Sequence, residues 1–299
     1  MKTITLKQMQ YFEALVKTRH FSRAADLCAI SQPALSMQIK KLEAFLDMPL
    51  VEKTSKPLRL TPFGEDFAIK IGAILQNVRD LGDMAKVSKL KPQGSIKLGV
   101  IPTIAPYLFP QLIHQVTKAF PSVNLKLRET ITTNLIDEVL EGRLDAAILA
   151  LPVSEPRLTE KSLFEEEFVL VRPISDNGKP IPNPDTLHEM HLLLLEEGHC
   201  FRDQALSFCN ISKKQTRELM DASSLSTLVQ MVAAGIGITL IPQMAASLES
   251  RSASVEMLRF EINPPKRSVG MIWRKNTPLE AHLEKIAKIL TKKDNIKVK

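Results

Sequence analysis

The stretch that decides the fold is AADLCAISQPALSMQIKKLE, residues 24–43. Ser31 is a preferred helix N-cap residue, and Pro33 falls in the first helical turn, where a missing N–H costs nothing. The apolar positions after it recur at helical spacing. They are Leu35, Ile39, Leu42 and Leu46. The run FSRAADLC (21–28) predicts a short preceding helix, with Ser22 as candidate N-cap and with Ala24, Ala25, Leu27 and Cys28 as closely packed residues. Two short helices joined by a short turn predict a helix-turn-helix.

An amphipathic helix is also expected upstream of this motif, with apolar positions Leu6, Met9, Phe12, Leu15 and Val16. The outer face of the helix that begins after Ser31 is polar and basic, which suits contacts to base edges and phosphates in a major groove. It carries Gln32, Ser36, Met37, Lys40 and Lys41. Ordinary helix capping is the alternative role for the residues at its start, and for Ser31 it is the main one.

Charge separates the chain into a basic start and a nearly neutral remainder. The net charge is +7 over 299 residues, and residues 1–61 hold ten basic and five acidic side chains. A basic module joined to a larger neutral one favours a polyanion-binding head under the control of a second domain. A composition of 44% hydrophobic and 24% charged residues is typical of globular proteins and excludes a disordered chain. No apolar run reaches the roughly 20 residues of a membrane span, and no export signal is present at the N-terminus, so we expect a cytoplasmic protein without a membrane partner.

Beyond the helix-turn-helix, LVEKTSKPLRLTPFG (50–64) alternates apolar and polar residues around a turn and predicts a two-stranded wing that carries Lys53 and Lys56. A long helix then runs over 62–90. Its apolar residues are spaced 4, 3, 4, 3 and predict a heptad seam that pairs with a second copy of the chain. The seam consists of Phe67, Ile71, Ile74, Val78 and Leu81. The alternative is a helix that lies on its own domain's core, but KPQG at 91–94 breaks the chain and favours a free-standing linker.

Residues 95–299 alternate between strand and helix patterns and predict an α/β domain with a parallel sheet covered by helices on both faces. The expected elements are strands at 95–102, 123–129 and 146–152 and helices at 105–120 and 133–145, followed by a second series from FVLVRP to SVGMIWR. Ligands in such sheets bind beyond the carboxyl ends of the strands. Those positions fall at 102–104, 130–133, 197–202 and 235–237.

Several familiar site motifs are incomplete or absent. AAGIGITLIP (233–242) lacks the third glycine of a dinucleotide-binding loop and precedes a strand, so Gly235 and Gly237 are interpreted as a helix C-cap and a turn. HEMH (188–191) lacks further ligands at metal-binding spacing and is interpreted as exposed histidines. We therefore expect no metal and no cofactor.

Cys200 and Cys209 are the remaining signal. Cys200 follows a buried strand next to His199 and is expected to begin a short helix that runs through Phe208. A helix N-terminus and nearby cationic groups favour the reactive thiolate. In a continuous helix the two cysteines lie roughly 13 Å apart at about 1.5 Å per residue, whereas a disulfide needs Cα atoms within about 7 Å. A bond between them requires the helix to unravel; two unrelated free thiols are the alternative.

The combined pattern of SQP, a following serine and Gln-Ile, the wing and the linker helix resembles the LysR-type transcriptional regulators. The resemblance implies a winged helix-turn-helix at 1–61, a dimerisation helix at 62–90, a hinge at 91–94 and a two-lobed, periplasmic-binding-protein-like regulatory domain at 95–299. It implies that bases face Gln32, Pro33, Ser36 and Met37 and that phosphates or the minor groove face Lys40, Lys53 and Lys56.

GHC, RDQA and FC within 198–209, together with IPTIAPYLFP (101–110), resemble the peroxide-sensing members of that family. This resemblance implies that Cys200 attacks hydrogen peroxide and that Cys209 then forms a disulfide with it. Cys28 falls on the apolar face of the helix predicted at 21–28, so we expect it to be a buried, inert thiol. The implied peroxide pocket consists of Thr103, Thr132, His199, Arg202 and Arg267. Peroxide is consumed as a signal, so the chain is not expected to be an enzyme.

The same resemblance implies promoter DNA, RNA polymerase and a glutaredoxin or thioredoxin reductant as partners, with a homotetramer as the assembled state. A LysR-type regulator that binds a small metabolite between its lobes is the alternative function. A thiol peroxidase is disfavoured, because the first 90 residues have no role in that activity.

Overall fold

The fold is described from a computed structural model that covers residues 3–52, 58–87, 94–182, 187, 190–209, 221–261 and 264–291. The chain divides into two compact units, Met1–Ala85 and Lys86–Lys299. Each unit is described by itself. No helix in the described part of the chain is long and apolar enough to cross a membrane.

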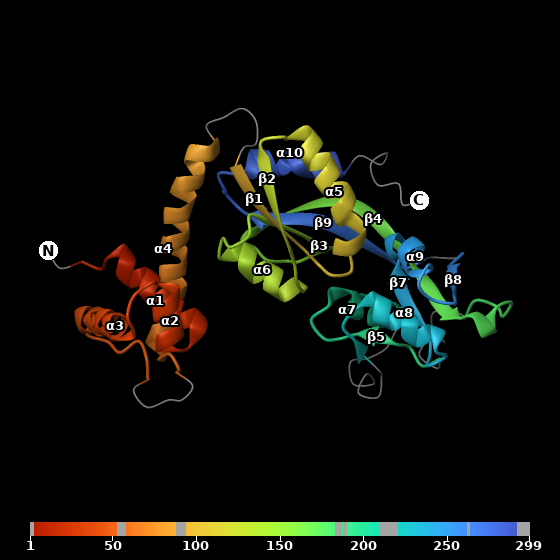
Figure 1. The fold of residues 1–299 in the computed structure, drawn as a ribbon, viewed down its shortest axis with the longest axis horizontal. Helices are drawn as coiled ribbons and strands as arrows, with labels where there is room; N and C mark the ends of the chain where they lie inside the picture. Colours follow the sequence, from red (N-terminus) through yellow and green to blue (C-terminus); the bar gives the residue numbers. More distant parts are fainter. Residues whose placement is uncertain are drawn as a thin grey trace. The chain divides into compact units, whose positions relative to one another are not determined.

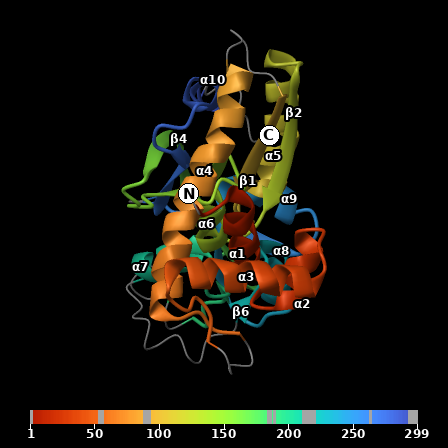
Figure 2. The ribbon, with the colours of Figure 1, turned by 90° about the vertical axis from the view of Figure 1, so that its left-hand side faces the viewer.

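The first unit contains the predicted helix-turn-helix. Its helices are α1 (Leu6–Thr18), α2 (Phe21–Leu27), α3 (Gln32–Leu46) and α4 (Pro62–Val87). As predicted, Ser31 caps α3 by accepting a hydrogen bond from the backbone N–H of Ala34, and Pro33 lies in the first turn. The buried residues of α1, α2 and α3 form one core with α4. Figure 2 shows α1, α2 and α3 gathered around the N-terminal part of α4.

Three details of α2 and one part of the wing differ from the expectations or lie outside the described residues. His20, not Ser22, caps α2, because its ring Nδ1 accepts the hydrogen bond from the Ser22 N–H. Leu27 is 69% exposed, and Cys28 is half-buried at the end of the helix instead of fully buried. The wing is represented by an antiparallel bridge between Val51 and Leu60, while Lys53 and Lys56 lie outside the described residues.

The predicted seam of α4 divides into two parts. Phe67 and Ile71 pack into the unit's own core, and the Phe67 ring lies 5.8 Å from the ring of Phe12. For these two residues the alternative, a helix that lies on its own domain's core, was right, because they cover the apolar side chains of the other helices. Ile74, Val78 and Leu81 remain exposed, Leu81 by 65%.

The second unit is built on a mixed sheet rather than the parallel sheet expected from the sequence. The elements of the first series lie at their predicted positions, except that α6 ends five residues earlier than predicted. They are β1 (Gly94–Val100), α5 (Ala105–Ala119), β2 (Val123–Glu129), α6 (Thr132–Leu140) and β3 (Ala146–Leu151). In the described residues the strand order is β2-β1-β3-β9-β4-β7, with β8 beside β4. The pairs of β1 with β2 and β3 are parallel, whereas every pair that involves β9 or β4 is antiparallel.

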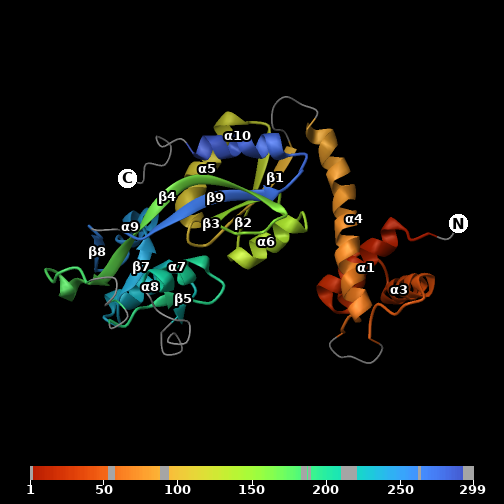
Figure 3. The ribbon, with the colours of Figure 1, turned by 180° about the vertical axis from the view of Figure 1, so that it is seen from behind.

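The long strands β4 (Leu158–Pro173) and β9 (Lys266–Arg274) account for this difference. FVLVRP and SVGMIWR are parts of these strands, which pair with each other, and β4 contributes residues to two hydrophobic cores. Because β4 contributes to both cores and Tyr107 packs against both, the unit has two lobes joined by continuous sheet. Figures 1 and 3 show α5 and α10 (Glu280–Leu290) on one face of the first lobe's strands and α6 on the other.

The second lobe contains the remaining elements, among them the helix with the two predicted thiols. They are η1 (Ile174–Asp176), β5 (Leu194–Leu195), α7 (Cys200–Phe208), β6 (Asp221–Ala222), α8 (Leu225–Ala233), β7 (Thr239–Pro242), α9 (Gln243–Glu249) and β8 (Val255–Arg259). The bounds of α7 confirm the predicted short helix. Gly235 has φ +77° directly after the C-cap of α8, which confirms its predicted role at the end of that helix.

Candidate functional site

The two cysteines lie at opposite ends of α7. Cys200 is its first residue, and Cys209 is its C-cap. Both are free thiols, Cys200 half-buried and Cys209 buried. Burial raises the pKa of Cys209 to about 12. Because the helix is continuous between them, the Cα atoms of the two residues are separated by roughly 13 Å at about 1.5 Å per residue.

The segment before α7 packs closely against the first lobe. Gly198 has φ +95°, and a Cβ at that position would lie 2.9 Å from the Cδ1 atom of Ile131. A side chain at 198 would therefore be strained and crowded. Cys200 packs against the core of the first lobe although its helix belongs to the second. The thiol thus lies where the two lobes meet.

Arg202 anchors α7 to the second lobe. Its Nη1 donates hydrogen bonds of 2.6 Å to the backbone oxygen of Leu195 on β5 and to Oδ1 of Asp221 on β6. The Arg202 side chain is buried and the Asp221 side chain is 38% exposed, so the bond to the Leu195 oxygen is the better shielded from water. Arg202 therefore holds the beginning of α7 in place, and these contacts direct its guanidinium towards β5 and β6.

Arg267 is the centre of a second buried network. Its Nε donates to Oε2 of Glu166 at 2.9 Å, and its Nη1 donates to Oγ1 of Thr103 at 2.9 Å. Its Nη2 donates to the backbone oxygen of Thr103 at 3.2 Å. The guanidinium carbon also lies 5.5 Å from the ring centre of Phe201, the residue after Cys200. Arg267 thereby links the loop after β1 to α7.

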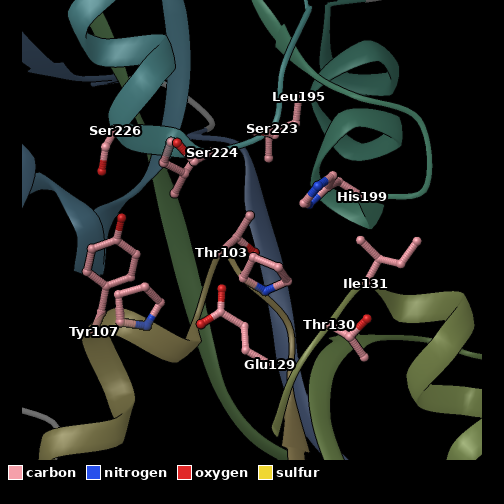
Figure 4. Close-up of a pocket in the computed structure, with 13 residues that line it drawn as sticks. Thr103, Tyr107, Glu129, Thr130, Ile131, Leu195, His199, Ser223, Ser224 and Ser226 are labelled. Atoms are coloured by element: carbon pink, nitrogen blue, oxygen red, sulfur yellow. The ribbon is translucent and has the colours of Figure 1, made fainter.

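A cavity of about 240 Å³ lies between the lobes. Figure 4 shows His199 on one side of it, Tyr107 and Ser226 on the other, and Thr103 and Glu129 between them. Segments just before α5, α6, α7 and α8 all contribute to its wall. Helix N-termini present unpaired N–H groups, which favours polar or anionic ligands in this space.

Burial shifts the pKa values of two groups at the cavity. Desolvation lowers the pKa of His199, and the nearby Glu196 opposes this shift only in part. Desolvation also raises the pKa of Glu129. On the far wall, Oε1 of the buried Glu249 accepts hydrogen bonds from Tyr107 at 2.7 Å and Ser226 at 2.9 Å. His199 is consequently biased towards the neutral ring, which can accept as well as donate a hydrogen bond.

The residues predicted for the peroxide pocket are only partly brought together. Thr103 and His199 line the cavity, whereas Thr132, Arg202 and Arg267 are not part of its wall. The Oγ1 atom of Thr132 is buried without a hydrogen-bond partner among the described residues. Arg202 and Arg267 are committed to the networks above. The hydrogen bonds described above engage each guanidinium with protein groups.

Sequence reasoning missed several residues of the site. Two contacts join positions more than 100 residues apart, and no local motif indicates them. They are the Glu166–Arg267 pair and the Tyr107–Glu249 hydrogen bond. Gln204 lies one turn after Cys200, on the same face of α7, and its Oε1 is buried without a partner among the described residues. Its helical spacing from Cys200 is the one sequence signal that could have indicated it.

The described residues contain no cluster that could hold a metal ion. Of the two histidines in HEMH, His191 is exposed and His188 lies outside the described residues. The outer face of α3 presents Gln32, Pro33, Met37 and Lys40 to solvent, with Ser36 half-buried. This face is the candidate nucleic-acid interface.

Two family models match the chain. Residues 6–65 match the bacterial regulatory helix-turn-helix protein, lysR family, and residues 90–294 match the LysR substrate binding domain. The chain is 37% identical, over 96% of its own length and 93% of the relative's, to a probable hydrogen peroxide-inducible genes activator of Streptomyces viridosporus.

Two solved structures resemble the whole chain. A cysteine-to-aspartate variant of full-length OxyR from Pseudomonas aeruginosa is 34% identical, with a TM-score of 0.75 over 97% of this chain and 95% of that one. A cysteine mutant of Corynebacterium glutamicum OxyR with H2O2 bound is 29% identical, with a TM-score of 0.66 over 99% of this chain and 95% of that one.

The different environments of the cysteines predict different alkylation rates in the reduced protein. A pKa of about 12 instead of the ordinary 9.0 lowers the thiolate fraction of Cys209 roughly a thousandfold. We expect iodoacetamide at pH 7.5 to label Cys200 at least about a hundredfold faster than Cys209, as followed by peptide mass spectrometry. In denaturant the rates should converge. Equal rates in the folded protein contradict this ordering.

Proposed function

Because the chain belongs to the LysR family of bacterial helix-turn-helix regulators, we propose that it senses hydrogen peroxide through Cys200 and Cys209. The observation that carries the proposal is the placement of the two thiols at the ends of α7, with Cys200 directly after His199, which lines a polar space between the lobes. The similarity to a hydrogen peroxide-inducible activator and to an H2O2-bound OxyR supports it.

The proposed chemistry has two steps. The Cys200 thiolate attacks one peroxide oxygen, an S–O bond forms, the O–O bond breaks, and the departing hydroxide takes a proton to become water. The Cys209 thiol then attacks the sulfur of the Cys200 sulfenic acid and releases a second water as the disulfide forms. Peroxide is reduced and the two thiols are oxidised, so no cofactor or metal is required. Peroxide acts as a stoichiometric signal, and the chain is a regulator instead of an enzyme.

The second step requires a conformational change. The distance between the Cα atoms of Cys200 and Cys209 must fall from roughly 13 Å to less than about 7 Å, and this is impossible while α7 remains helical. Residues that now hold α7, including Phe201, Arg202 and buried Cys209, must then leave their positions. A glutaredoxin or thioredoxin would reverse the change by reducing the disulfide.

For the DNA-binding unit, we propose that Gln32, Pro33, Ser36 and Met37 face bases. Lys40 would contact a phosphate, and Lys53 and Lys56 the backbone or minor groove. The support is the solvent-exposed face of α3 in a helix-turn-helix fold. The target would be promoter DNA, with RNA polymerase as the partner in activation.

The exposed stripe of α4, formed by Ile74, Val78 and Leu81, is proposed to pair with the same stripe of a second copy. Three apolar side chains at 4 and 3 residue spacing form a short seam that is unfavourable to leave in water. A two-fold dimer places two recognition helices for a two-fold DNA site. Assembly of two such dimers would give the expected homotetramer.

A second candidate function is supported by the size of the cavity. Its volume of about 240 Å³ exceeds the space of a few water molecules, each about 30 Å³ in the liquid. Hydroxyl and carboxyl groups at its wall could hold a small polar metabolite. A ligand-dependent rise in melting temperature that survives substitution of both Cys200 and Cys209 is the result specific to this alternative.

The peroxide proposal predicts one disulfide. After stoichiometric H2O2, non-reducing peptide mapping should show Cys200 linked to Cys209, with Cys28 still free. Cys200→Ser should abolish the link and the transcriptional response while DNA binding is retained. Cys209→Ser should instead accumulate a sulfenic acid on Cys200, which dimedone traps. Oxidation scattered over all three thiols, or an intact response in Cys200→Ser, contradicts the proposal.

The proposed phosphate contact of Lys40 predicts a change in salt dependence. Lys40→Ala should reduce the slope of log affinity against log salt by about 0.9 for each phosphate that the protein no longer neutralises. The measurement is a fluorescence titration of duplex DNA at several salt concentrations. Lys118→Ala, an exposed lysine on α5, is the matched control and should leave the slope unchanged. A slope identical to wild type in Lys40→Ala removes Lys40 from the interface.

The stripe on α4 predicts self-association. Leu81→Asp should raise the dimer dissociation constant at least about tenfold, since burial of one leucine contributes about 1.5–3 kcal/mol. Sedimentation equilibrium measures this constant. Ala73→Asp adds the same charge at an exposed position of α4 outside the stripe and should have a much smaller effect. Equal effects of the two variants would mean that Leu81 lies outside the dimer contact.

A further inference from the structure

We propose that Glu166 is a positioning residue for peroxide sensing: it acts through Arg267 and Thr103 to aim a hydroxyl proton at peroxide bound near Cys200. This inference rests on the proposed function. It concerns a carboxylate on β4 that no sequence motif indicates and that lies 101 residues from its arginine partner.

Both carboxylate oxygens of Glu166 are occupied. Oε2 accepts from Arg267, with Nε at 2.9 Å and Nη2 at 2.7 Å. Oε1 accepts from the backbone N–H of Met244 in α9 at 2.7 Å. The side chains of Glu166 and Arg267 are 5% and 0% exposed, so the pair is enclosed by protein. A buried carboxylate that is itself held by a backbone N–H keeps the guanidinium in one orientation.

Arg267 passes this orientation to Thr103. Its Nε and Nη2 are directed to Glu166 and to the Thr103 backbone oxygen, and its Nη1 donates to Oγ1 of Thr103. A guanidinium has no acceptor, so the Thr103 hydroxyl receives this bond and keeps its own proton for another partner. Thr103 lines the cavity that His199 also lines. The Thr103 hydroxyl therefore has a proton that it can donate to a molecule bound in the cavity.

The same guanidinium is fixed relative to the reacting thiol. Arg267 lies over the ring of Phe201, which directly follows Cys200 and packs against Phe168 with ring centres 4.8 Å apart. A donor that meets the departing peroxide oxygen stabilises its developing negative charge, and this effect depends on placement to within about 1 Å. Loss of Glu166 would release Arg267 and so misdirect the Thr103 proton.

The test compares two reagents at the same sulfur. In a Cys209→Ser background, the rates at which Cys200 reacts with H2O2 and with iodoacetamide are measured by peptide mass spectrometry. Iodoacetamide needs the thiolate but no donor to a leaving oxygen. Glu166→Gln supplies only one oxygen where two acceptors are needed. It should slow the H2O2 reaction by about ten- to a hundredfold, while the iodoacetamide rate changes less than about twofold.

Two further variants separate positioning from general destabilisation. Peroxide selectivity is the rate at which Cys200 reacts with H2O2 divided by its rate with iodoacetamide. Glu166→Asp keeps both carboxylate oxygens but draws them back by one methylene group. This variant should retain more peroxide selectivity than Glu166→Gln and less than wild type. Glu256→Gln removes the carboxylate that pairs with buried Arg172 at 2.6 Å, away from the thiol site, and should keep wild-type selectivity. If Glu166→Gln does not fold, a folded Glu166→Asp with wild-type selectivity overturns the inference.

The outcomes distinguish this inference from the proposed function. A wild-type Cys200 that reacts with H2O2 no faster than Cys28 removes the function itself. If Cys200 in wild type and in Glu166→Gln shows the same high ratio of H2O2 rate to iodoacetamide rate, the proposed function stands and only the role of Glu166 is overturned. If Glu166→Gln lowers the H2O2 rate and the iodoacetamide rate of Cys200 by the same factor, Glu166 has a purely structural role, and the inference is overturned.

Discussion

The buried ion pair between Arg267 and Glu166 is the constraint on which the arrangement of the regulatory unit depends. It joins β9 to β4, holds the loop after β1 through Thr103, and binds an N–H in the first turn of α9 through Met244. Removal of one partner of such a pair strands a charge in the protein interior, at a cost of about 3–5 kcal/mol. The two lobes therefore share one electrostatic centre close to the thiol helix.

The contacts that stabilise α7 oppose the disulfide proposed between the cysteines at its two ends. Phe201, Leu206 and Cys209 are buried in the second core, and Arg202 is bonded to both short strands. These contacts stabilise the helix that keeps the thiols apart. Disulfide formation would exchange them for a covalent bond, so the helix and the oxidised arrangement exclude each other. Such mutual exclusion is what a two-state regulatory element requires.

Agreement between sequence and structure depended on how local the information was. The cap at Ser31, the start of α7 at Cys200 and the position of Thr103 after a buried strand follow from neighbouring residues. The antiparallel insertion of β9 does not, because alternating patterns are compatible with either direction of a strand. Phe67 and Ile71 fit a heptad equally well whether the helix meets a second copy or its own core.

The amino-acid sequence by itself determined the helix-turn-helix, the linker helix, the α/β character of the large unit and the two cysteines that carry the redox proposal. These features depend on periodicity and short motifs, which act over a few turns of chain. Only the tertiary structure decided that Arg267 pairs with Glu166 and Thr103, and that Arg202 is committed to β5 and β6. Side-chain partners across a folded core are chosen by packing and desolvation, and no local pattern records that choice.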